Sequence, residues 1–333
     1  MTKFRILTLT DHSGHSKENS IYALLRELRL HKNCADLFVA SRGSKENSSF
    51  FEQLDKNKLF GRKVPVNIEY QHEAPIFTTE LSPLLLADFD ILFLRLPRPI
   101  SNEFLLWLKA EFAHGVVIND PAGIIETSNK AFLQEFPDLC PPIKLCHSIA
   151  EVMEMAELFP IVLKPLEDYG GRGLLKIDGN HLDDGNTVHD TSSYLRGISN
   201  YISTEGYLAM KYLKNVTKGD KRILVVGGEI MASSLRLPPA DSWLCNVARG
   251  GKSVGTTVTK REKEIIAKVS PILLEKGIFI FGADTLVDDD GQRILSELNT
   301  LSIGGFPQAE AQTGMPIIKQ SIDKFFQYAT AKL

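Results

Sequence analysis

The stretch Gly282-Ala-Asp-Thr-Leu-Val-Asp-Asp-Asp-Gly-Gln-Arg-Ile-Leu-Ser-Glu-Leu-Asn299 decides the fold of the second half of the chain. Two apolar runs flank Asp290-Gly291, a dipeptide typical of a two-residue hairpin turn. Pairing residues outward from this turn places Asp284 directly opposite Glu297. Asn299, two residues beyond Glu297, is predicted to lie on the same face of its strand.

Two carboxylates that face each other on a sheet repel, because their Cβ atoms are only about 4.5–5.5 Å apart. Leu286 and Leu295 are expected to continue the same face, which predicts that the pair is partly buried. Carboxylate and amide oxygens are hard ligands that suit Mg²⁺, so Asp284, Glu297 and Asn299 are predicted to bind a divalent cation. A solvated sheet edge, or one carboxylate kept protonated, is the alternative interpretation.

A lysine and a glycine-rich loop follow the predicted strand Ile161-Val-Leu-Lys-Pro165. The glycines of Tyr169-Gly-Gly-Arg-Gly173 let backbone amides approach phosphate oxygens, and Lys164 supplies a positive charge nearby. The chain has neither the Gly-x-x-x-x-Gly-Lys-Ser/Thr pattern of a P-loop nor the Gly-x-Gly-x-x-Gly pattern of dinucleotide-binding proteins. A phosphate-binding loop and an ordinary turn are both compatible with this stretch.

A second hairpin is predicted with Gly227-Gly228 at its turn, and Arg222 lies within its first strand. A charged side chain in a strand needs a partner, either a bidentate carboxylate or phosphate ligand or an internal salt bridge. Strict pairing through the turn puts Arg222 and Arg236 on opposite faces, so both can reach one ligand only if the hairpin contains a bulge. Prolines and glycines bound the segment 238–255, which is predicted to be a flap over a charged ligand or an exposed loop.

The composition limits the class of protein. The 333 residues are 43% apolar and 24% charged, which is typical of a globular chain of about two domains. A net charge of -3 argues against nucleic acid or an anionic membrane as partner, and no apolar run approaches the ~18 residues of a membrane span. The four cysteines form no Cys-x-x-Cys pair, which indicates reduced thiols in a cytoplasmic protein.

Strand and helix signals alternate in the first third of the chain, which predicts a parallel α/β unit. Strands are expected at Phe4–Thr10, Asp36–Ala40, Asp90–Arg95 and Val116–Ile118, and helices at Asn19–His31 and Ser101–Ala113. The region 41–81 is polar and poorly periodic, and its structure is left open. Capping boxes predict helix starts at Ser148 and Thr259, and strands dominate after Tyr207. The fold class is therefore α/β followed by α+β.

Taken in order, these motifs resemble those of the prokaryotic glutathione synthetases, which belong to the ATP-grasp superfamily. The resemblance is carried by Asn129-Lys130, Val162-Leu-Lys-Pro165 with Gly170-Gly171, Gly219-Asp-Lys-Arg222, Asn246 with Gly250-Gly251, Gly282-Ala-Asp284 and Glu297-Leu-Asn299. It covers essentially the whole chain and is thinner in the first 120 residues. It implies an α/β N-terminal domain (1–122) followed by an α+β ATP-grasp fold. That fold would comprise a small subdomain with the glycine-rich loop (123–205) and a large one with the metal site and the flap (206–333, flap 238–255).

The resemblance also implies roles for individual residues. ATP would be held by Lys130, Lys164, Gly170, Gly171, Met210, Lys211, Tyr212, Leu213 and Asp220. Of these, 210–213 would line the adenine pocket and Asp220 would meet the ribose. Mg²⁺ would be bound by Asp284, Glu297 and Asn299, with Mn²⁺ left open. The peptide substrate and the phosphoryl group would be contacted by Arg222, Arg236, Asn246 and Ser302, and the catalytic residues would be Arg222, Arg236 and Lys164.

The implied activity is that of an ATP-dependent carboxylate–amine ligase, glutathione synthase. The carboxylate of γ-glutamylcysteine would attack the γ-phosphate of ATP, and glycine would then attack the resulting acylphosphate, giving glutathione, ADP and phosphate. A cytoplasmic homo-oligomer is implied, because family members commonly assemble, with small-molecule substrates and neither nucleic acid nor membrane as partner.

Three stretches depart from the family pattern, and one of them is the flap, which has Leu244 and Lys252 where arginines are expected. Asn299 is followed by Thr300-Leu-Ser-Ile-Gly-Gly305 where the family often has Ser-Pro-Thr, and Leu96-Pro-Arg-Pro99 replaces Lys-Asp-Pro-Pro. The acceptor amine and the donor peptide therefore stay open. The alternative is an ATP-grasp ligase that adds another amino acid to a peptide or protein C-terminus. A nucleotide-binding regulator without turnover is disfavoured, because Lys164, Asp284, Glu297 and Asn299 are all present.

Overall fold

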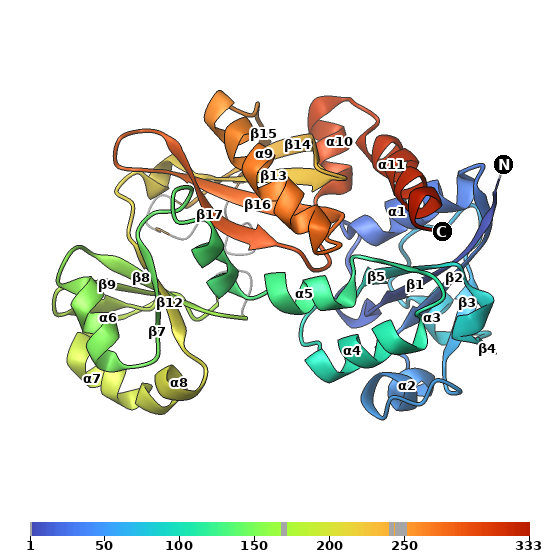
Figure 1. Ribbon diagram of the computed structural model, residues 1–333, viewed down its shortest axis with the longest axis horizontal. Helices are drawn as coiled ribbons and strands as arrows, with labels where there is room; N and C mark the ends of the chain where they lie inside the picture. Colours follow the sequence, from blue (N-terminus) through green and yellow to red (C-terminus); the bar gives the residue numbers. More distant parts are fainter. Residues whose placement is uncertain (1, 168–171, 240–242, 244–251) are drawn as a thin grey trace.

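The computed structural model describes residues 2–167, 172–239, 243 and 252–333, and these residues fold around three β-sheets (Figure 1). The first sheet has the strand order β4-β3-β2-β1-β5-β6, in which β1, β2, β5 and β6 run parallel. Its strands are β1 (Phe4–Thr10), β2 (Cys34–Ser41), β3 (Phe60–Lys63), β4 (Ser82–Pro83), β5 (Ile91–Arg95) and β6 (Val116–Ile118). The helices of this unit are α1 (Ser20–Leu30), α2 (Ser48–Glu52), α3 (Pro75–Thr78), α4 (Asn102–Glu111) and α5 (Pro121–Thr127). The α/β unit predicted for the first third of the chain is therefore confirmed.

The second sheet is antiparallel and has the strand order β11-β10-β9-β8-β12-β7. Its strands are β7 (Ile143–Cys146), β8 (Ile161–Pro165), β9 (Leu175–Asp178), β10 (His181–Asp183), β11 (Val188–Asp190) and β12 (Tyr207–Lys211), and its helices are α6 (Ile149–Ala156), α7 (Thr191–Gly197) and α8 (Ser199–Thr204). Because β12 pairs with β7 and β8, a boundary drawn by sheet membership falls between Lys211 and Asp220 rather than at 205. The division into an N-terminal domain and two subdomains stays a prediction.

The third sheet is antiparallel and contains the hairpin that was predicted around Asp290-Gly291. Its order is β15-β14-β13-β16-β17. The strands are β13 (Asp220–Val226), β14 (Glu229–Leu237), β15 (Lys252–Gly255), β16 (Ile280–Val287) and β17 (Arg293–Asn299), and the helices are α9 (Lys260–Glu275), α10 (Phe306–Thr313) and α11 (Ile317–Lys332). Helix α9 lies along this sheet (Figure 1), and its apolar residues share one core with Ile223, Phe281 and Leu295. Successive side chains of a strand alternate between faces, so the neighbours of these core residues point away from α9.

Both predicted capping boxes lie at helix starts. Thr259 precedes α9, where its hydroxyl accepts a hydrogen bond from the Glu262 amide (3.2 Å) and the Glu262 carboxylate accepts one from the Thr259 amide (2.7 Å). Ser148 precedes α6 and its hydroxyl accepts from the Glu151 amide (3.2 Å), while the Glu151 carboxylate accepts from the amide of His147 (2.7 Å), one residue before the cap. These short-range patterns place helices reliably because they satisfy backbone amides that otherwise have no partner.

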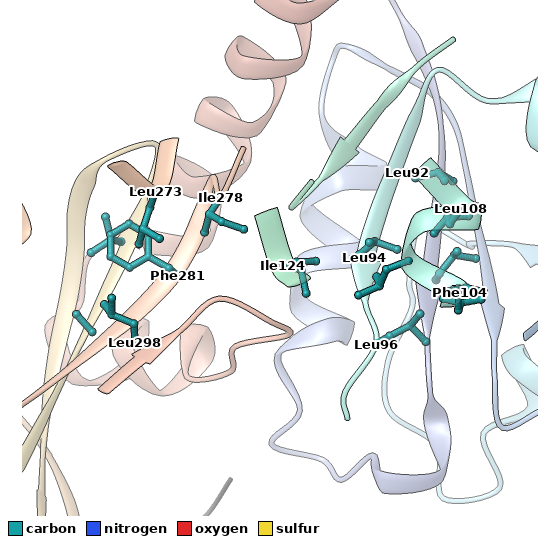
Figure 2. Close-up of a cluster of buried hydrophobic side chains, with 14 of the residues drawn as sticks. Leu92, Leu94, Leu96, Phe104, Leu108, Ile124, Leu273, Ile278, Phe281 and Leu298 are labelled. Carbon is teal, nitrogen blue, oxygen red and sulfur yellow. The ribbon is translucent and has the colours of Figure 1, made fainter. Parts of the chain in front are cut away.

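The largest core joins the first and third sheets. Figure 2 shows Ile124 of α5 between a group on the first unit, with Leu94 and Phe104, and a group on the third, with Ile278 and Phe281. The second sheet has a separate core with residues of β8 and β12, while Leu208 and Met210 of β12 belong to the largest core. Among the described helices, none has the length and hydropathy needed to span a bilayer.

Candidate functional site

The β16–β17 hairpin confirms the pairing of the two carboxylates, but the turn is longer than predicted. Asp284 is the register partner of Glu297 and Val287 pairs with Arg293. The Asp288 amide then donates to the Gln292 carbonyl (2.8 Å), which leaves three residues, 289–291, in the loop. Gly291 has a positive φ of 86°, as the last position of a three-residue hairpin loop requires. The predicted two-residue turn at Asp290-Gly291 was therefore wrong.

A β-bulge restores the register that the longer turn would have shifted. The pairing changes between Asp284 and Thr285, which leaves Ser296 as the extra residue of β17. Leu295 now pairs with Thr285 and joins the α9 core, so the prediction that it shares a face with Asp284 was wrong. The Ser296 hydroxyl donates to the carbonyl of Asp284 (3.0 Å), which fixes the bulge beside the carboxylate pair.

The β13–β14 hairpin contains the bulge that the sequence required. Gly227 and Gly228 both have positive φ values (59° and 81°), which fits the predicted two-residue turn. The register shifts between Leu224 and Val225, after which Arg222 pairs with Ser234. Arg222 and Arg236 consequently lie on the same face of the sheet.

Both of these arginines form ion pairs with Asp284. The Arg222 side chain is bidentate, with Nε 2.8 Å from Oδ1 and Nη2 2.6 Å from Oδ2 of Asp284. Arg236 Nη2 (2.8 Å) and the Asn299 amide (3.2 Å) also donate to Oδ2. Burial alone would raise the pKa of Asp284, but the two guanidinium groups outweigh it and hold that pKa below its usual range. The structure thus realises the internal salt bridge that the sequence had left open for Arg222.

Glu297 and Asp220 differ from Asp284 in their partners. In the described part of the chain, Glu297 has no ion pair, although it lies next to Asp284 across the strands. Asp220 pairs with Arg236 through Oδ2, while its Oδ1 is buried without a hydrogen-bond partner among the described residues. Burial and the neighbouring charge of Asp284 raise the pKa of Asp220 to about 6, against the opposing effect of Arg236.

Lys164 connects the second sheet to this carboxylate row. It lies on β8, is buried to 8% exposure, and donates from Nζ to the carbonyl of Ser296 (3.0 Å). The bulge therefore presents an otherwise free carbonyl to a lysine from another sheet. Lys130 is equally buried, and its amide donates to the carbonyl of Leu166 (3.0 Å), which ties it to the end of β8.

A cavity of about 410 Å³ lies where these groups meet. Its lining includes every described residue of the predicted site, namely Lys130, Lys164, Met210, Lys211, Tyr212, Leu213, Asp220, Arg222, Arg236, Asp284, Glu297, Asn299 and Ser302. The predicted residues Gly170, Gly171 and Asn246 lie outside the described residues, as does most of the predicted flap 238–255. Positive side chains outnumber carboxylates in the described lining, which suits a ligand with several negative charges.

The end of β12 forms an apolar and aromatic wall of this cavity. Met210 and Leu213 are buried, and the Lys176 ammonium lies 4.1 Å from the centre of the Tyr212 ring. Trp243 meets Tyr212 edge to face, with ring centroids 6.4 Å apart, and its indole donates to Asp183 (3.0 Å). An apolar and aromatic wall with a few polar groups is typical of a small-molecule binding pocket.

Several lining residues were not predicted. They are Pro97, Arg98, Val162, Arg172, Leu174, Val216, Trp243, Leu286, Ser296, Leu301, Ile303 and Gly304. Arg98 carried a usable signal, because it is a charged residue between two prolines, three residues beyond the end of the buried strand β5. The apolar members carried none, because an apolar residue in a pocket has the same sequence pattern as one in a core.

Comparison with known proteins gives a consistent assignment. The family profile described as "Prokaryotic glutathione synthetase, ATP-grasp domain" matches residues 129–314. The chain is 31% identical over 236 residues to the glutathione synthetase of Brucella melitensis, covering 70% of this chain and 72% of that protein. It is 30% identical over 268 residues to the glutathione synthetase of Mesorhizobium japonicum, covering 79% and 82% of the two chains.

Solved structures agree on the fold at low sequence identity. The D-cycloserine synthetase DcsG superposes with a TM-score of 0.66 at 10% identity, covering 98% of this chain and 99% of that one. The D-alanine–D-alanine ligase of Bacillus anthracis, in complex with ATP, gives a TM-score of 0.58 at 13% identity, covering 99% and 100%. From the matched profile, the relatives and the fold, the chain belongs to the prokaryotic glutathione synthetase family of ATP-grasp proteins.

Proposed function

We propose that this protein is an ATP-dependent carboxylate–amine ligase that joins γ-glutamylcysteine to glycine and releases ADP and phosphate. The observation that carries the proposal is that residues from β8, β12, β13, β14, β16 and β17 all line one cavity, within a chain of this family. Such a reaction needs positioning and charge neutralisation more than covalent catalysis, and the cavity is rich in both kinds of group.

ATP is assigned to the side of the cavity formed by the second and third sheets. The adenine would lie against Met210 and Tyr212, and the triphosphate would reach Lys130 and Lys164. The unpartnered Oδ1 of Asp220 supports a ribose contact, because a buried acceptor requires a donor such as a hydroxyl group. The predicted contacts of Lys211 and Leu213, and of Gly170 and Gly171 outside the described residues, belong to the same proposal.

Asp284, Glu297 and Asn299 fit a divalent cation by the chemistry of their oxygens and by their adjacent register positions. The cation, Mg²⁺ or Mn²⁺, would neutralise developing charge on the phosphates. Both carboxylate oxygens of Asp284 accept hydrogen bonds from Arg222 or Arg236 in this structure. These arginines would therefore have to move away from Asp284 for a cation to bind there. Arg222 and Arg236 are then available to hold the carboxylate and phosphoryl oxygens of the substrates.

The carboxylate of the donor peptide would attack the γ-phosphate and form an acylphosphate, which the acceptor amine then attacks. Ser302, and Asn246 outside the described residues, are proposed to contact the peptide. The segment 238–255 is proposed to exclude water, because acylphosphates hydrolyse. A cytoplasmic homo-oligomer with reduced cysteines remains part of the proposal. Three buried free thiols among the described residues, Cys34, Cys140 and Cys146, support the reduced state of the cysteines.

A second candidate function follows from the loop after Asn299. The family motif Ser-Pro-Thr is replaced by Ser302-Ile-Gly-Gly305, and Gly304 lines the cavity. A glycine leaves room for a larger acceptor, so an ATP-grasp ligase that adds a different amino acid to a peptide or protein C-terminus is the alternative.

The test is phosphate release from ATP and Mg²⁺ with γ-glutamylcysteine, with and without glycine, and with mass spectrometry of the product. We expect release that depends on both substrates and a product equal in mass to glutathione. Dependence on γ-glutamylcysteine with another amino acid preferred to glycine would favour the second candidate. Release that depends on neither substrate would refute both assignments.

A further inference from the structure

Arg98 reaches the cavity from the first sheet, on a segment that the proposed function leaves unused. It lies three residues beyond the end of β5 and lines the cavity with Ser302 and Gly304. Of the described lining residues that come from the first sheet and its connections, Arg98 is the charged one. Its surroundings therefore decide what it can bind.

The backbone on both sides of Arg98 is held in place by another arginine. Arg42 donates to the carbonyl oxygens of Pro97 (3.1 Å) and Pro99, and its Nε is paired with Asp11 (2.8 Å) at the end of β1. The two prolines also restrict the chain through their fixed φ angles. Arg98 is consequently presented to the cavity by a rigid segment, which is the condition for a specific binding group.

The same segment is joined to the loop after Asn299. The Ser302 hydroxyl donates to the carbonyl of Arg95 (3.1 Å), and the buried guanidinium of Arg95 donates to the carbonyl of Ile303. Arg98 and the loop that distinguishes this chain from its family are therefore fixed relative to each other. Together they form a wall of the cavity that comes from the first sheet and from the chain after β17, whereas the proposed adenine wall comes from the second sheet.

The guanidinium of Arg98 has hydrogen-bonding capacity to spare. It donates to Glu167 Oε2 (2.6 Å) and to the Ser128 hydroxyl (2.9 Å), while its buried Nε has no partner among the described residues. The side chain of Arg98 is 14% exposed and that of Glu167 is 59% exposed. An ion pair with so exposed a carboxylate contributes only about 0–1 kcal/mol, so a ligand carboxylate can displace Glu167.

We propose that Arg98 binds the α-carboxylate of an amino-acid substrate and so helps to determine specificity. A planar guanidinium with a free Nε matches a carboxylate in bidentate geometry. Both substrates carry an α-carboxylate that does not react, one at the glutamyl end of the donor and one on the acceptor. This inference rests on the proposed function, and the experiment separates the two sources of the carboxylate.

The kinetic test compares R98Q and R98K with R62Q, a control in which Arg62 pairs with Glu80 away from the cavity. We expect R98Q to raise the KM for one carboxylate substrate tenfold or more, with the KM for ATP within twofold of wild type. A raised KM for γ-glutamylcysteine assigns the glutamyl end, and a raised KM for glycine assigns the acceptor. R98K should recover only part of the loss, because an ammonium lacks the bidentate fork. R62Q should leave all three KM values within twofold.

A binding experiment distinguishes failure of this inference from failure of the proposed function. Both substrates are titrated calorimetrically into protein saturated with Mg²⁺ and a non-hydrolysable ATP analogue. Wild-type protein that binds neither γ-glutamylcysteine nor glycine would overturn the proposed function. Wild type that binds them, with R98Q or R98K binding equally well, would overturn the role of Arg98 alone. E167Q should bind them at least as tightly as wild type, and a loss matching that of R98Q would show that the Arg98–Glu167 pair is only structural.

Discussion

Asp284 and Glu297 are adjacent carboxylates with different electrostatic surroundings. Asp284 accepts hydrogen bonds from Arg222, Arg236 and Asn299, so its charge is already compensated within the sheet. From the sequence, a cation, a solvated sheet edge or a protonated carboxylate could relieve the repulsion between the two acids, and nothing connected Arg222 and Arg236 with Asp284. That connection depends on β13 lying beside β16, and the strand order is a tertiary feature. Removing the charge from one acid should therefore differ in consequence from removing it from the other.

Removing the charge of Glu297 should cost far less stability than removing that of Asp284. D284N leaves two guanidinium groups without their carboxylate and is expected to lower the free energy of unfolding by about 3 kcal/mol. E297Q breaks no ion pair with any described residue and should change it by less than about 0.5 kcal/mol. Urea unfolding without metal measures both values. The proposed cation site also requires that Mg²⁺ with an ATP analogue raises the melting temperature of wild type but not of E297Q. Equal destabilisation by the two variants would contradict this account.

At the scale of elements, the sequence predicted both hairpins and the bulge between β13 and β14, but not the bulge between β16 and β17. Gly227-Gly228 gave the correct two-residue turn, and the need for Arg222 and Arg236 to meet one partner correctly demanded a bulge. Asp290-Gly291 gave the correct hairpin but the wrong loop length. Asp284 still pairs with Glu297 because Ser296 forms a bulge, and the Ser296 carbonyl accepts a hydrogen bond from Lys164 of another sheet. Such a contact between sheets leaves no local pattern in the sequence.

The region 41–81 shows the same limit. Its helices α2 and α3 and its strand β3 are short, so periodicity has too few residues to act on. Asn47 organises it instead, donating to the carbonyls of Ser41 and Phe60 (both 2.9 Å) and accepting from the Phe60 amide (2.7 Å). A buried asparagine that replaces a ladder of backbone hydrogen bonds cannot be recognised from one sequence. The α/β order and most of the cavity, by contrast, followed from strands and motifs.

Glu262 links α9 to the third sheet and should be essential for stability. It is fully buried, pairs with Lys221 of β13 (2.8 Å) and accepts from the Thr285 hydroxyl of β16 (2.8 Å). Burial acts to raise its pKa, but Lys221 and the hydrogen bonds from Thr259 and Thr285 lower it below the ordinary value. We expect E262Q to reduce the free energy of unfolding at pH 7 by about 3–5 kcal/mol, as measured by urea unfolding.

The pH dependence of this effect has a definite sign. A carboxyl group with a lowered pKa stabilises the fold above its unfolded pKa, and this contribution is lost as the pH falls through the folded pKa. The difference between wild type and E262Q should therefore shrink below about pH 4. E229Q serves as control, because Glu229 pairs with Lys324 at 68% exposure and should cost less than about 1 kcal/mol. A difference that grows in acid would contradict the assignment.

Across the whole molecule, the largest apolar core joins the first and third sheets and also includes Leu208 and Met210 of β12, while several polar contacts tie the second sheet to the other two. Ile124 lies in the core shared by the first and third sheets (Figure 2), whereas Lys164–Ser296, Lys211–Asp289 and Arg98–Glu167 connect the second sheet. The proposed ATP site lies where these polar contacts are, so bound substrates would compete for the side chains of Lys164, Lys211 and Arg98.

Asn119 follows β6 and makes buried hydrogen bonds from the first sheet to the chain around β16 and β17. Its amide donates to the carbonyls of Ile280 (2.7 Å) and Thr300 (2.8 Å), and its oxygen accepts from the amides of Phe279 (2.9 Å) and Ile280 (2.8 Å). N119A leaves these buried backbone groups unpaired, so the free energy of unfolding should fall by at least about 3 kcal/mol. N33A is the matched control, because Asn33 makes an exposed bond to Thr2 and should cost under about 1 kcal/mol.

The location of Asn119 also predicts which kinetic constant changes. Thr300 begins the loop that leads to Ser302 and Gly304, while the proposed adenine wall belongs to the second sheet. N119A protein that is still folded at low temperature should show a raised KM for the amino-acid substrates and a nearly unchanged KM for ATP. Steady-state phosphate release at 10 °C, for N119A beside N33A, measures both constants. A rise in the KM for ATP alone would mean that the first sheet supports the nucleotide. The proposed separation of the cavity into an adenine wall and an amino-acid wall would then be wrong.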